Sequence, residues 1–129
     1  MNIFHRTCER IFGFRKRALQ LGGTRAERGS FGEDRAAEFA RRELGYRIIA
    51  RNWCYKRDEI DLICQDGAVL VFIEVRLRRS SALVPAYYSV NAKKKKILQR
   101  VCKQYLQQLQ KRPKHFRFDV IALALSDAG

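Results

Sequence analysis

The chain has 129 residues, about the size of one domain, and its 27 lysines and arginines against 13 acidic residues give a formal net charge of +14. Hydrophobic residues make up 47%, enough for an ordinary core, which argues against wholesale disorder. No apolar run approaches the ~18 residues of a membrane span, and residues 1–13 lack the apolar segment of a secretory signal. We therefore expect a soluble domain with no membrane association, whose positive field suits a polyanion.

The four cysteines, at positions 8, 54, 64 and 102, are widely separated along the chain. The sequence lacks the paired short spacings of a zinc site, and no secretory signal accompanies the cysteines to favour disulfides. We expect reduced thiols in a cytoplasmic protein, with Cys64 and Cys102 acting as small core residues.

Residues 1–28 carry seven basic and two acidic residues around a short aromatic segment. We interpret them as a basic N-terminal arm, with or without a short helix, that is weakly tied to a domain at residues 29–129. The sequence Ser30-Phe31-Gly32-Glu33 matches a capping box, which predicts a helix from there to about Leu44, ended by Gly45.

Three strands are predicted next, at residues 46–52, 59–64 and 69–76. The last two flank Asp66-Gly67, which between apolar runs is a strong signal for a hairpin. Residues 77–90 show no clear period and predict a long loop.

An amphipathic helix is predicted over residues 92–110, and a final strand, apolar on both faces and therefore central, over residues 116–125. The last strand must return through the long helix, so we expect it to lie parallel to and beside residues 69–76. The predicted fold class is α/β, a mixed sheet flanked by helices, with the order α-β-β-β-α-β.

Acidic residues gather between positions 33 and 74, whereas residues 76–117 include thirteen basic residues and no acidic one. A two-residue Asp66-Gly67 turn would place Glu59 opposite Glu74, with Asp61 as a diagonal neighbour about 7–8 Å away on the same face. A divalent ion could bridge the carboxylates of Asp61 and Glu74, although an ion pair at a strand end is the structural alternative.

Glu33 lies one helical turn before the predicted buried stripe, so it could join the same carboxylates, although an acid also favours a helix N-terminus. The second helix opens with four lysines, Lys93, Lys94, Lys95 and Lys96, where positive charge opposes the helix dipole. A solvated basic end is the ordinary explanation, but phosphate contact accounts better for this placement. Lys94 borders the buried face and is best able to reach inward.

Several short motifs recur in a fixed order over residues 29–125: Gly32-Glu33-Asp34-x-Ala36-Ala37, Gly45-Tyr46-Arg47-Ile48, Asn52, Glu59-Ile60-Asp61-Leu62-Ile63, Val71-Phe72-Ile73-Glu74-Val75-Arg76, Arg78 and Arg117-Phe118-Asp119-Val120. Together they resemble the YraN family of small bacterial proteins. That family is grouped with the PD-(D/E)xK nuclease superfamily and is similar to archaeal Holliday-junction resolvases. The resemblance implies a restriction-endonuclease-like fold, which agrees with the element order predicted above.

The resemblance also implies roles for individual residues. Glu33 matches the acid of the first helix, Asp61 the central metal-binding aspartate, and Glu74 the acid of the E-x-K element. These three, with the backbone carbonyl of Val75, would hold Mg²⁺ or Mn²⁺. Lys94 matches a basic residue common at the start of the family's second helix.

Two positions depart from the pattern. Arg76 stands where the superfamily has a lysine, and an arginine stays protonated, so it can clamp a phosphate but cannot act as a general base. Asp58 stands where the family usually has glycine; if that position needs a positive φ, aspartate is tolerated better than most residues.

We therefore expect a metal-dependent endonuclease-like protein that acts on DNA more readily than RNA, with Arg76 as a catalytic phosphate clamp. Nucleic acid would contact Arg78, Arg79 and the four lysines at 93–96. Resemblance to resolvases implies branched DNA as substrate and a homodimer. The alternative, favoured by Arg76, is a non-catalytic nucleic-acid-binding protein on a degenerate nuclease scaffold.

Overall fold

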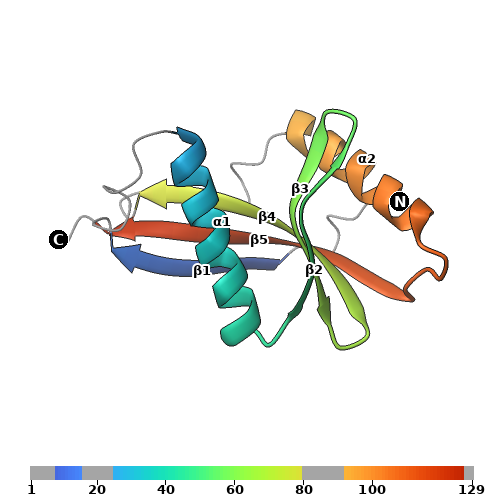
Figure 1. Cartoon of the computed structure of the whole chain (residues 1–129), viewed down its shortest axis with the longest axis horizontal. Coiled ribbons are helices and arrows are strands. Elements are labelled where there is room, and N and C mark those ends of the chain that lie inside the picture. The colour runs from blue at the N-terminus through green and yellow to red at the C-terminus, as the bar shows by residue number, and fades with distance from the viewer. Residues whose placement is uncertain (1–7, 16–24, 80–91, 127–129) are drawn as a thin grey trace.

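The structure is a computed structural model that describes the backbone of residues 8–15, 25–79 and 92–126, and the side chains of residues 32–76 and 92–123. The described elements, in chain order, are β1 (Cys8–Arg15), α1 (Arg25–Arg42), β2 (Arg47–Tyr55), β3 (Asp58–Asp66), β4 (Val69–Arg79), α2 (Ala92–Gln108) and β5 (His115–Ser126). In Figure 1, α1 crosses β1, β5 and β4, whereas α2 lies beside the β2–β3 hairpin.

In the described part of the chain, the strands form one sheet of five in the order β1-β5-β4-β3-β2. β2, β3 and β4 are antiparallel neighbours, and β5 runs parallel to both β4 and β1. The predicted element order, the mixed sheet and the parallel return of the last strand beside β4 are confirmed. β5 is central, as its apolar faces predict.

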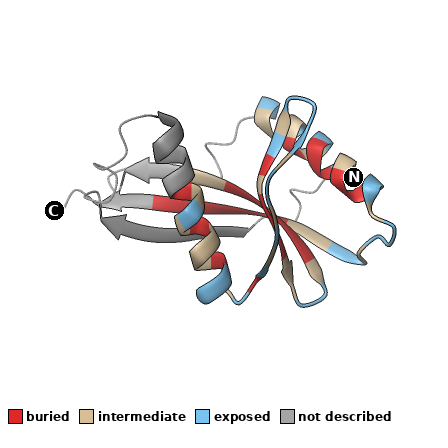
Figure 2. Cartoon of the chain, in the orientation of Figure 1, coloured by how far each residue is buried: buried red, intermediate tan, exposed pale blue. Residues whose placement is uncertain are grey.

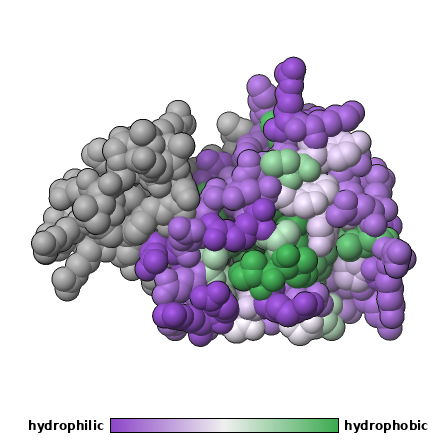
Figure 3. Space-filling view, in the orientation of Figure 1, coloured by the Kyte–Doolittle hydropathy of each residue, from purple (hydrophilic) through white to green (hydrophobic). Residues whose placement is uncertain are grey.

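Alternating side chains of the central strands build two cores, one on each face of the sheet. Phe72 packs beneath α2, whereas its neighbours Val71 and Ile73 pack on the face that α1 covers. Cys64 and Cys102 are fully buried, as predicted, and both are free thiols. Figure 2 shows the buried residues following the central strands. On the face drawn in Figure 3, the coloured part of the surface is mostly hydrophilic and has its largest hydrophobic area near the centre. Burying a side chain such as Phe72 contributes about 1.5–3 kcal/mol, so these cores fix the sheet that carries the site.

β1 was not predicted. Where an arm, with or without a short helix, was expected, residues 8–15 form an edge strand that pairs with β5 from Cys8–Asp119 to Arg15–Ser126. A parallel edge strand depends on a partner more than a hundred residues away, and its mixed charged and aromatic sequence carries no clear period of two.

α1 begins earlier than predicted. It starts at Arg25, so Ser30 and Glu33 lie inside the helix and the capping-box interpretation is wrong. Ala26, Glu27 and Arg28 are strong helix formers that allow the extension. The proposed division between arm and domain, at residues 28 and 29, falls within this helix and otherwise remains a prediction.

α1 ends at Arg42, two residues before its predicted end, and Gly45 follows as the predicted stop. Its φ of +71 belongs to the left-handed region that glycine enters without steric cost. The Tyr46 amide then donates to the Ala40 carbonyl oxygen at 2.9 Å, which turns the chain into β2.

The β3–β4 turn consists of Gly67 and Ala68, not Asp66 and Gly67. Asp66 stays in the ladder opposite Val69, and Gly67 has a φ of +57. The Asp66 carboxylate is engaged by Arg117 at 3.1 Å, which favours keeping it in β3. The predicted register is therefore wrong by two residues, and Glu59 does not pair with Glu74.

Other boundaries differ by a few residues. β4 continues through Arg79, into the stretch predicted as a loop, and residues 80–91 lie outside the described part of the chain. α2 ends at Gln108, two residues before its predicted end. Neither of these described helices, α1 nor α2, is long and apolar enough to cross a bilayer.

Candidate metal and phosphate site

The site begins at a kink in the β2–β3 hairpin. Ile60 and Ile63 of β3 are three residues apart, yet both pack beneath α2, so the alternation of faces is interrupted between them. Asn52 of β2, with a φ of +51, lies at the register position opposite Asp61. Asparagine tolerates this left-handed conformation better than most residues. The kink therefore sets the direction of the Asp61 side chain.

β3 and β4 separate at the same point. Their ladder ends with the pair Leu62–Ile73, one residue from Asp61. The Val75 amide of β4 then donates to Asp61 Oδ2 at 2.8 Å instead of to the backbone of β3. Asp61 therefore fills the opening between two central strands with a carboxylate.

Carboxylates from three elements meet at this opening. Glu33 of α1 and Glu59 and Asp61 of β3 each offer an oxygen within 4.8 Å of the other two. Glu74 of β4 adds a fourth carboxylate, whose charge helps to raise the pKa of Asp61. We call these four residues the acid cluster. The structure thus brings Glu33 and Asp61 together through the kink and not through the predicted register, and Glu74, the third acid selected from the sequence, lies near enough to affect the pKa of Asp61.

Burial and mutual repulsion raise the pKa values of three members of the acid cluster, Glu33, Asp61 and Glu74. Desolvation, followed by the charge of Glu74, raises the pKa of Asp61 to about 7. Desolvation also raises the pKa values of Glu33 and Glu74, although a side-chain hydrogen bond from Asn52 opposes the shift at Glu33. Carboxylate oxygens are the ligands that Mg²⁺ and Mn²⁺ prefer, and a bound cation would favour the ionised form of each acid. The donor set therefore fits a hard divalent cation.

Two basic side chains border the acid cluster. Arg76 Nε lies 3.7 Å and Lys94 Nζ 4.0 Å from Glu74 Oε1, and both charges act to lower the pKa of Glu74. The Nε atom of Arg76 is buried and has no hydrogen-bond partner in the described part of the chain. A buried donor without an acceptor is costly, so this Nε–H is suited to donate a hydrogen bond to a ligand oxygen. Lys94 reaches inward, as predicted.

The remaining predicted residues are less central. Lys93 and Lys96 lie on the exposed side of α2, and Lys95 is half-buried. Arg78 and Arg79 belong to β4, but their side chains lie outside the described part. The amide of Val75 is engaged by Asp61, and metal binding by its carbonyl stays a prediction.

Asp58 has a structural contact. It accepts two hydrogen bonds from Arg100 of α2, from Nε at 2.8 Å and from a terminal nitrogen at 3.1 Å. The positive φ in the β2–β3 turn belongs to Lys56, so the conditional explanation for Asp58 does not apply. Asp58 instead ties the β2–β3 hairpin to α2.

Sequence reasoning missed two residues of the site. Glu59 was expected opposite Glu74 on the face of Phe72 and was assigned no ligand role; its neighbour Ile60 packs on that face instead, and Glu59 lies beside Glu33. Asn52 was noted only as a motif position, although its side chain hydrogen-bonds Glu33 and its backbone forms the kink. An asparagine inside a strand pattern was the available signal, because asparagine is depleted in strands.

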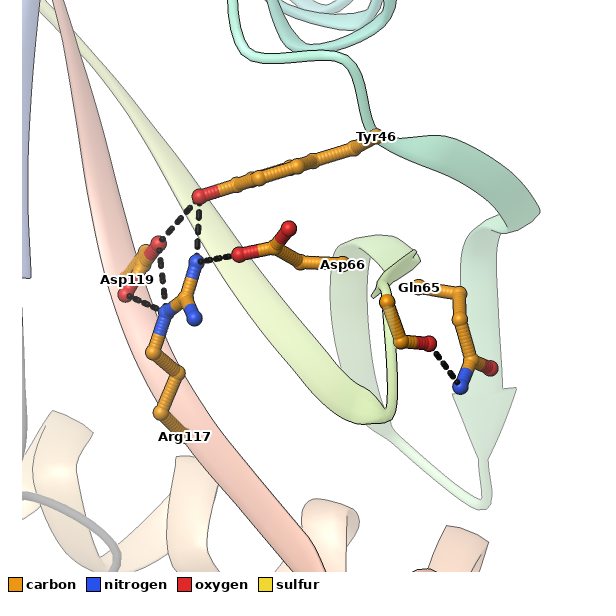
Figure 4. A network of polar contacts seen from close by, with 6 residues as sticks. Tyr46, Gln65, Asp66, Arg117 and Asp119 are labelled. Carbon is orange, nitrogen blue, oxygen red and sulfur yellow. Dashed lines mark hydrogen bonds and ion pairs between the residues drawn. The ribbon is translucent and has the colours of Figure 1, made fainter.

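A second polar network lies on the α1 side of the sheet, near the β3–β4 turn (Figure 4). Arg117 Nε donates to Asp119 Oδ1 at 3.1 Å, and a terminal nitrogen donates to Asp66 Oδ2 at 3.1 Å and also to the Tyr46 hydroxyl. Asp119 is fully buried, and the Arg117 guanidinium lies 5.4 Å from the centre of the Tyr46 ring. This network joins β5 to β3 and to the start of β2, so it gives the Arg117–Asp119 motif a structural role.

Fold and site together define a class: an α/β protein with clustered carboxylates where two central strands separate, and basic side chains beside them. Residues 32–123 match the model of the uncharacterised protein family UPF0102, and the chain belongs to this family, which confirms the resemblance to the YraN family. A UPF0102 protein of Symbiobacterium thermophilum is 47% identical over 93 residues, covering 72% of this chain and 78% of the relative. UPF0102 proteins of Pelotomaculum thermopropionicum (40% identical; 78% and 83% covered) and Ectopseudomonas mendocina (41%; 73% and 83%) are also similar.

Proposed function

We propose that this protein is a metal-dependent endonuclease-like enzyme that hydrolyses phosphodiester bonds of DNA, with branched DNA as the favoured substrate. The observation that carries the proposal is the convergence of Glu33, Glu59 and Asp61 within 4.8 Å, beside Glu74. In a chain with a formal charge of +14, carboxylates facing a polyanion oppose binding unless they hold a cation.

The acid cluster would hold Mg²⁺ or Mn²⁺ through its carboxylate oxygens, with the Val75 carbonyl as a further ligand. When bound, such a cation polarises the scissile phosphate and lowers the pKa of a bound water. The Val75 amide keeps the Asp61 carboxylate oriented, and the Asn52 side chain does the same for Glu33.

Arg76 is the phosphate clamp in this proposal. Its Nε is buried, lacks a hydrogen-bond partner in the described residues, and lies beside Glu74. A guanidinium hydrogen-bonds phosphate oxygens in a fixed planar geometry and stabilises the charge that develops on them. Lys94 adds a second positive charge. The flanking DNA backbone is contacted by the other basic residues, namely Lys93, Lys95, Lys96, Arg78 and Arg79.

The test is a cleavage assay on labelled four-way junction, flap and linear DNA, with Mg²⁺ or Mn²⁺ and with EDTA. We expect metal-dependent cutting of the junction and flap by the wild type, and loss of at least about 100-fold in Asp61→Asn, since one electrostatic contact to the reacting groups is worth that much. Asp34→Asn is the matched control, because Asp34 is an exposed neighbour paired with Arg51 and lies outside the acid cluster. Cutting that survives Asp61→Asn would point to a contaminating nuclease and overturn the proposal.

A second candidate function is nucleic-acid binding without catalysis. Arg76 favours it, because an arginine cannot take a proton from the attacking water as a lysine can. Wild-type protein that binds junction DNA tightly but cuts none of the three substrates with either metal would establish this candidate in place of the first.

A further inference from the structure

A groove of about 720 Å³ lies beyond the C-terminal end of α2, away from the acid cluster. Its walls come from the start of β2, the β3–β4 turn and the connection between α2 and β5. Lys94, at the other end of α2, contacts the acid cluster. With 1.5 Å of rise per residue, about 22 Å of helix separates Lys94 from Leu109 at the groove.

The rim of the groove is basic and its floor is apolar. Arg47 and the exposed residues Lys111, Arg112 and Lys114 line the rim, and none of the described residues that line the groove is acidic. Ile49, Leu70 and Leu109 contribute apolar surface, and Ile49 is 38% exposed, unusually high for a large aliphatic side chain in this structure. Such a lining complements a ligand that is anionic on one side and apolar on the other.

The outer face of α2 connects the two sites. Three exposed lysines lie on this face, directly opposite the buried one: Lys93, Lys96 and Lys103. Arg100 lies between them and is paired with Asp58. α2 contains no acidic residue, so the intrahelical Glu–Lys pairs that usually stabilise a surface helix are missing from it. Like charges at these spacings destabilise a helix, and a polyanion lying against the three lysines would relieve their repulsion.

We propose that the groove binds an unpaired nucleotide of the DNA, while the adjoining duplex lies along the outer face of α2. The proposal rests on the proposed function and deepens it, because it assigns the substrate class: DNA with a single-stranded segment near the cut. Inside a duplex the faces of the bases are covered by stacking and only their edges are exposed, whereas the face of an unpaired base can be buried against apolar side chains. About 22 Å matches roughly six or seven steps of 3.4 Å along one strand of duplex.

The groove is tested by DNA affinity in EDTA, so that cleavage plays no part. Fluorescence anisotropy is measured with a blunt duplex and with the same duplex extended by a single-stranded overhang. We expect Lys111→Ala/Arg112→Ala to weaken binding of the overhang duplex about tenfold and of the blunt duplex less than about twofold, since stacking and backbone contacts to unpaired nucleotides are lost together. Ile49→Ala removes apolar surface of the groove but no charge, so it should weaken binding of the overhang duplex only.

Arg41→Ala/Arg42→Ala is the matched control, because it removes two adjacent exposed arginines at the end of α1. The control should affect both duplexes equally and slightly. Equal losses on both duplexes in Lys111→Ala/Arg112→Ala would overturn the groove proposal, as would a polyglutamate peptide that competes as well as an oligothymidylate of the same charge.

The groove and the proposed function fail in different ways. Metal-dependent cutting with no preference for the overhang duplex would overturn the groove proposal and leave the proposed endonuclease function intact. An intact preference without any cutting would leave the groove standing and support the non-catalytic candidate. Circular dichroism of each variant confirms that the fold is retained.

Discussion

Asp61 is the residue on which the site depends. It lies opposite the kinked Asn52, accepts the Val75 amide at 2.8 Å, and sits among other carboxylates, so desolvation and repulsion raise its pKa to about 7. A carboxylate kept at this cost among like charges is characteristic of a functional group.

Without a divalent cation, Asp61 should make the stability of the protein depend on pH. Between its ordinary pKa of 3.8 and about 7, the folded chain keeps a proton on Asp61 that the unfolded chain has released. Stability therefore falls as pH rises, by up to about 1.4 kcal/mol per pH unit for one group. In EDTA, urea unfolding of the wild type should give a free energy about 2 kcal/mol lower at pH 8 than at pH 5, and Asp61→Asn should flatten this difference. The same pH dependence in both proteins would contradict the assignment.

In the proposed endonuclease, Arg76 limits the efficiency of the chemistry, because it stands where a lysine could act as a base. We expect Arg76→Lys to raise the metal-dependent cleavage rate by about tenfold or more, because lysine can release its proton and act as a base near the attacking water. Single-turnover rates on junction DNA provide the measurement. A slower Arg76→Lys enzyme would instead mean that the planar guanidinium contact to phosphate matters more than a base at this position.

At the scale of elements, the site is made by two hairpins. The β3–β4 pair separates after Leu62 and Ile73, and the β2–β3 pair kinks at Asn52, whose φ is +51. Glu33 of α1 reaches the kink because Asn52 hydrogen-bonds it. The geometry of the acid cluster is therefore a property of the hairpins and the helix together.

The kink can be tested through Asn52, whose side chain is exposed. Asn52→Val should destabilise the protein by about 1–2 kcal/mol more than Asn52→Gly, because a β-branched residue resists positive φ whereas glycine adopts it freely. Both variants lose the hydrogen bond to Glu33, so their difference isolates the backbone conformation. Urea unfolding of the two variants gives this difference, and equal stabilities would show that the kink relaxes without cost.

The helices and central strands were predictable because their apolar residues recur with clear periods. The prediction of which β4 side chains share a face of the sheet was also correct. The register error was two residues, and an even shift leaves each side chain on its own face. The turn position was not predictable, because Asp66 is kept in β3 by Arg117, a partner from β5. The place of Glu59 in the acid cluster was missed for the same reason, because it depends on the register and on the kink at Asn52.

At the scale of the whole molecule, charge is divided between the two kinds of site. Acidic residues gather around the strand opening, while residues 76–117 are basic without exception among their charged side chains. The outer face of α2 carries this charge from the acid cluster to the groove. Whether two copies associate, as the resemblance to resolvases implies, stays a prediction.

The basic face of α2 should dominate the salt dependence of DNA binding. Each phosphate contact to duplex DNA contributes about 0.9 to the slope of log affinity against log salt concentration, so Lys93→Ala/Lys96→Ala should reduce the slope by about 1.8. Anisotropy titrations of a blunt duplex at several salt concentrations measure the slope. The Arg41→Ala/Arg42→Ala control should leave the salt slope unchanged. If the slope is equally unchanged in Lys93→Ala/Lys96→Ala, the duplex does not lie on the outer face of α2.

The most direct test of the account is calorimetric titration of Mn²⁺ into the protein, since the central claim is that the acid cluster binds a divalent cation. The wild type and Asp34→Asn should bind with a saturable heat, and Asp61→Asn should lose that binding while remaining folded. Retention of wild-type Mn²⁺ binding in Asp61→Asn would contradict the claim, as would its absence from the wild type.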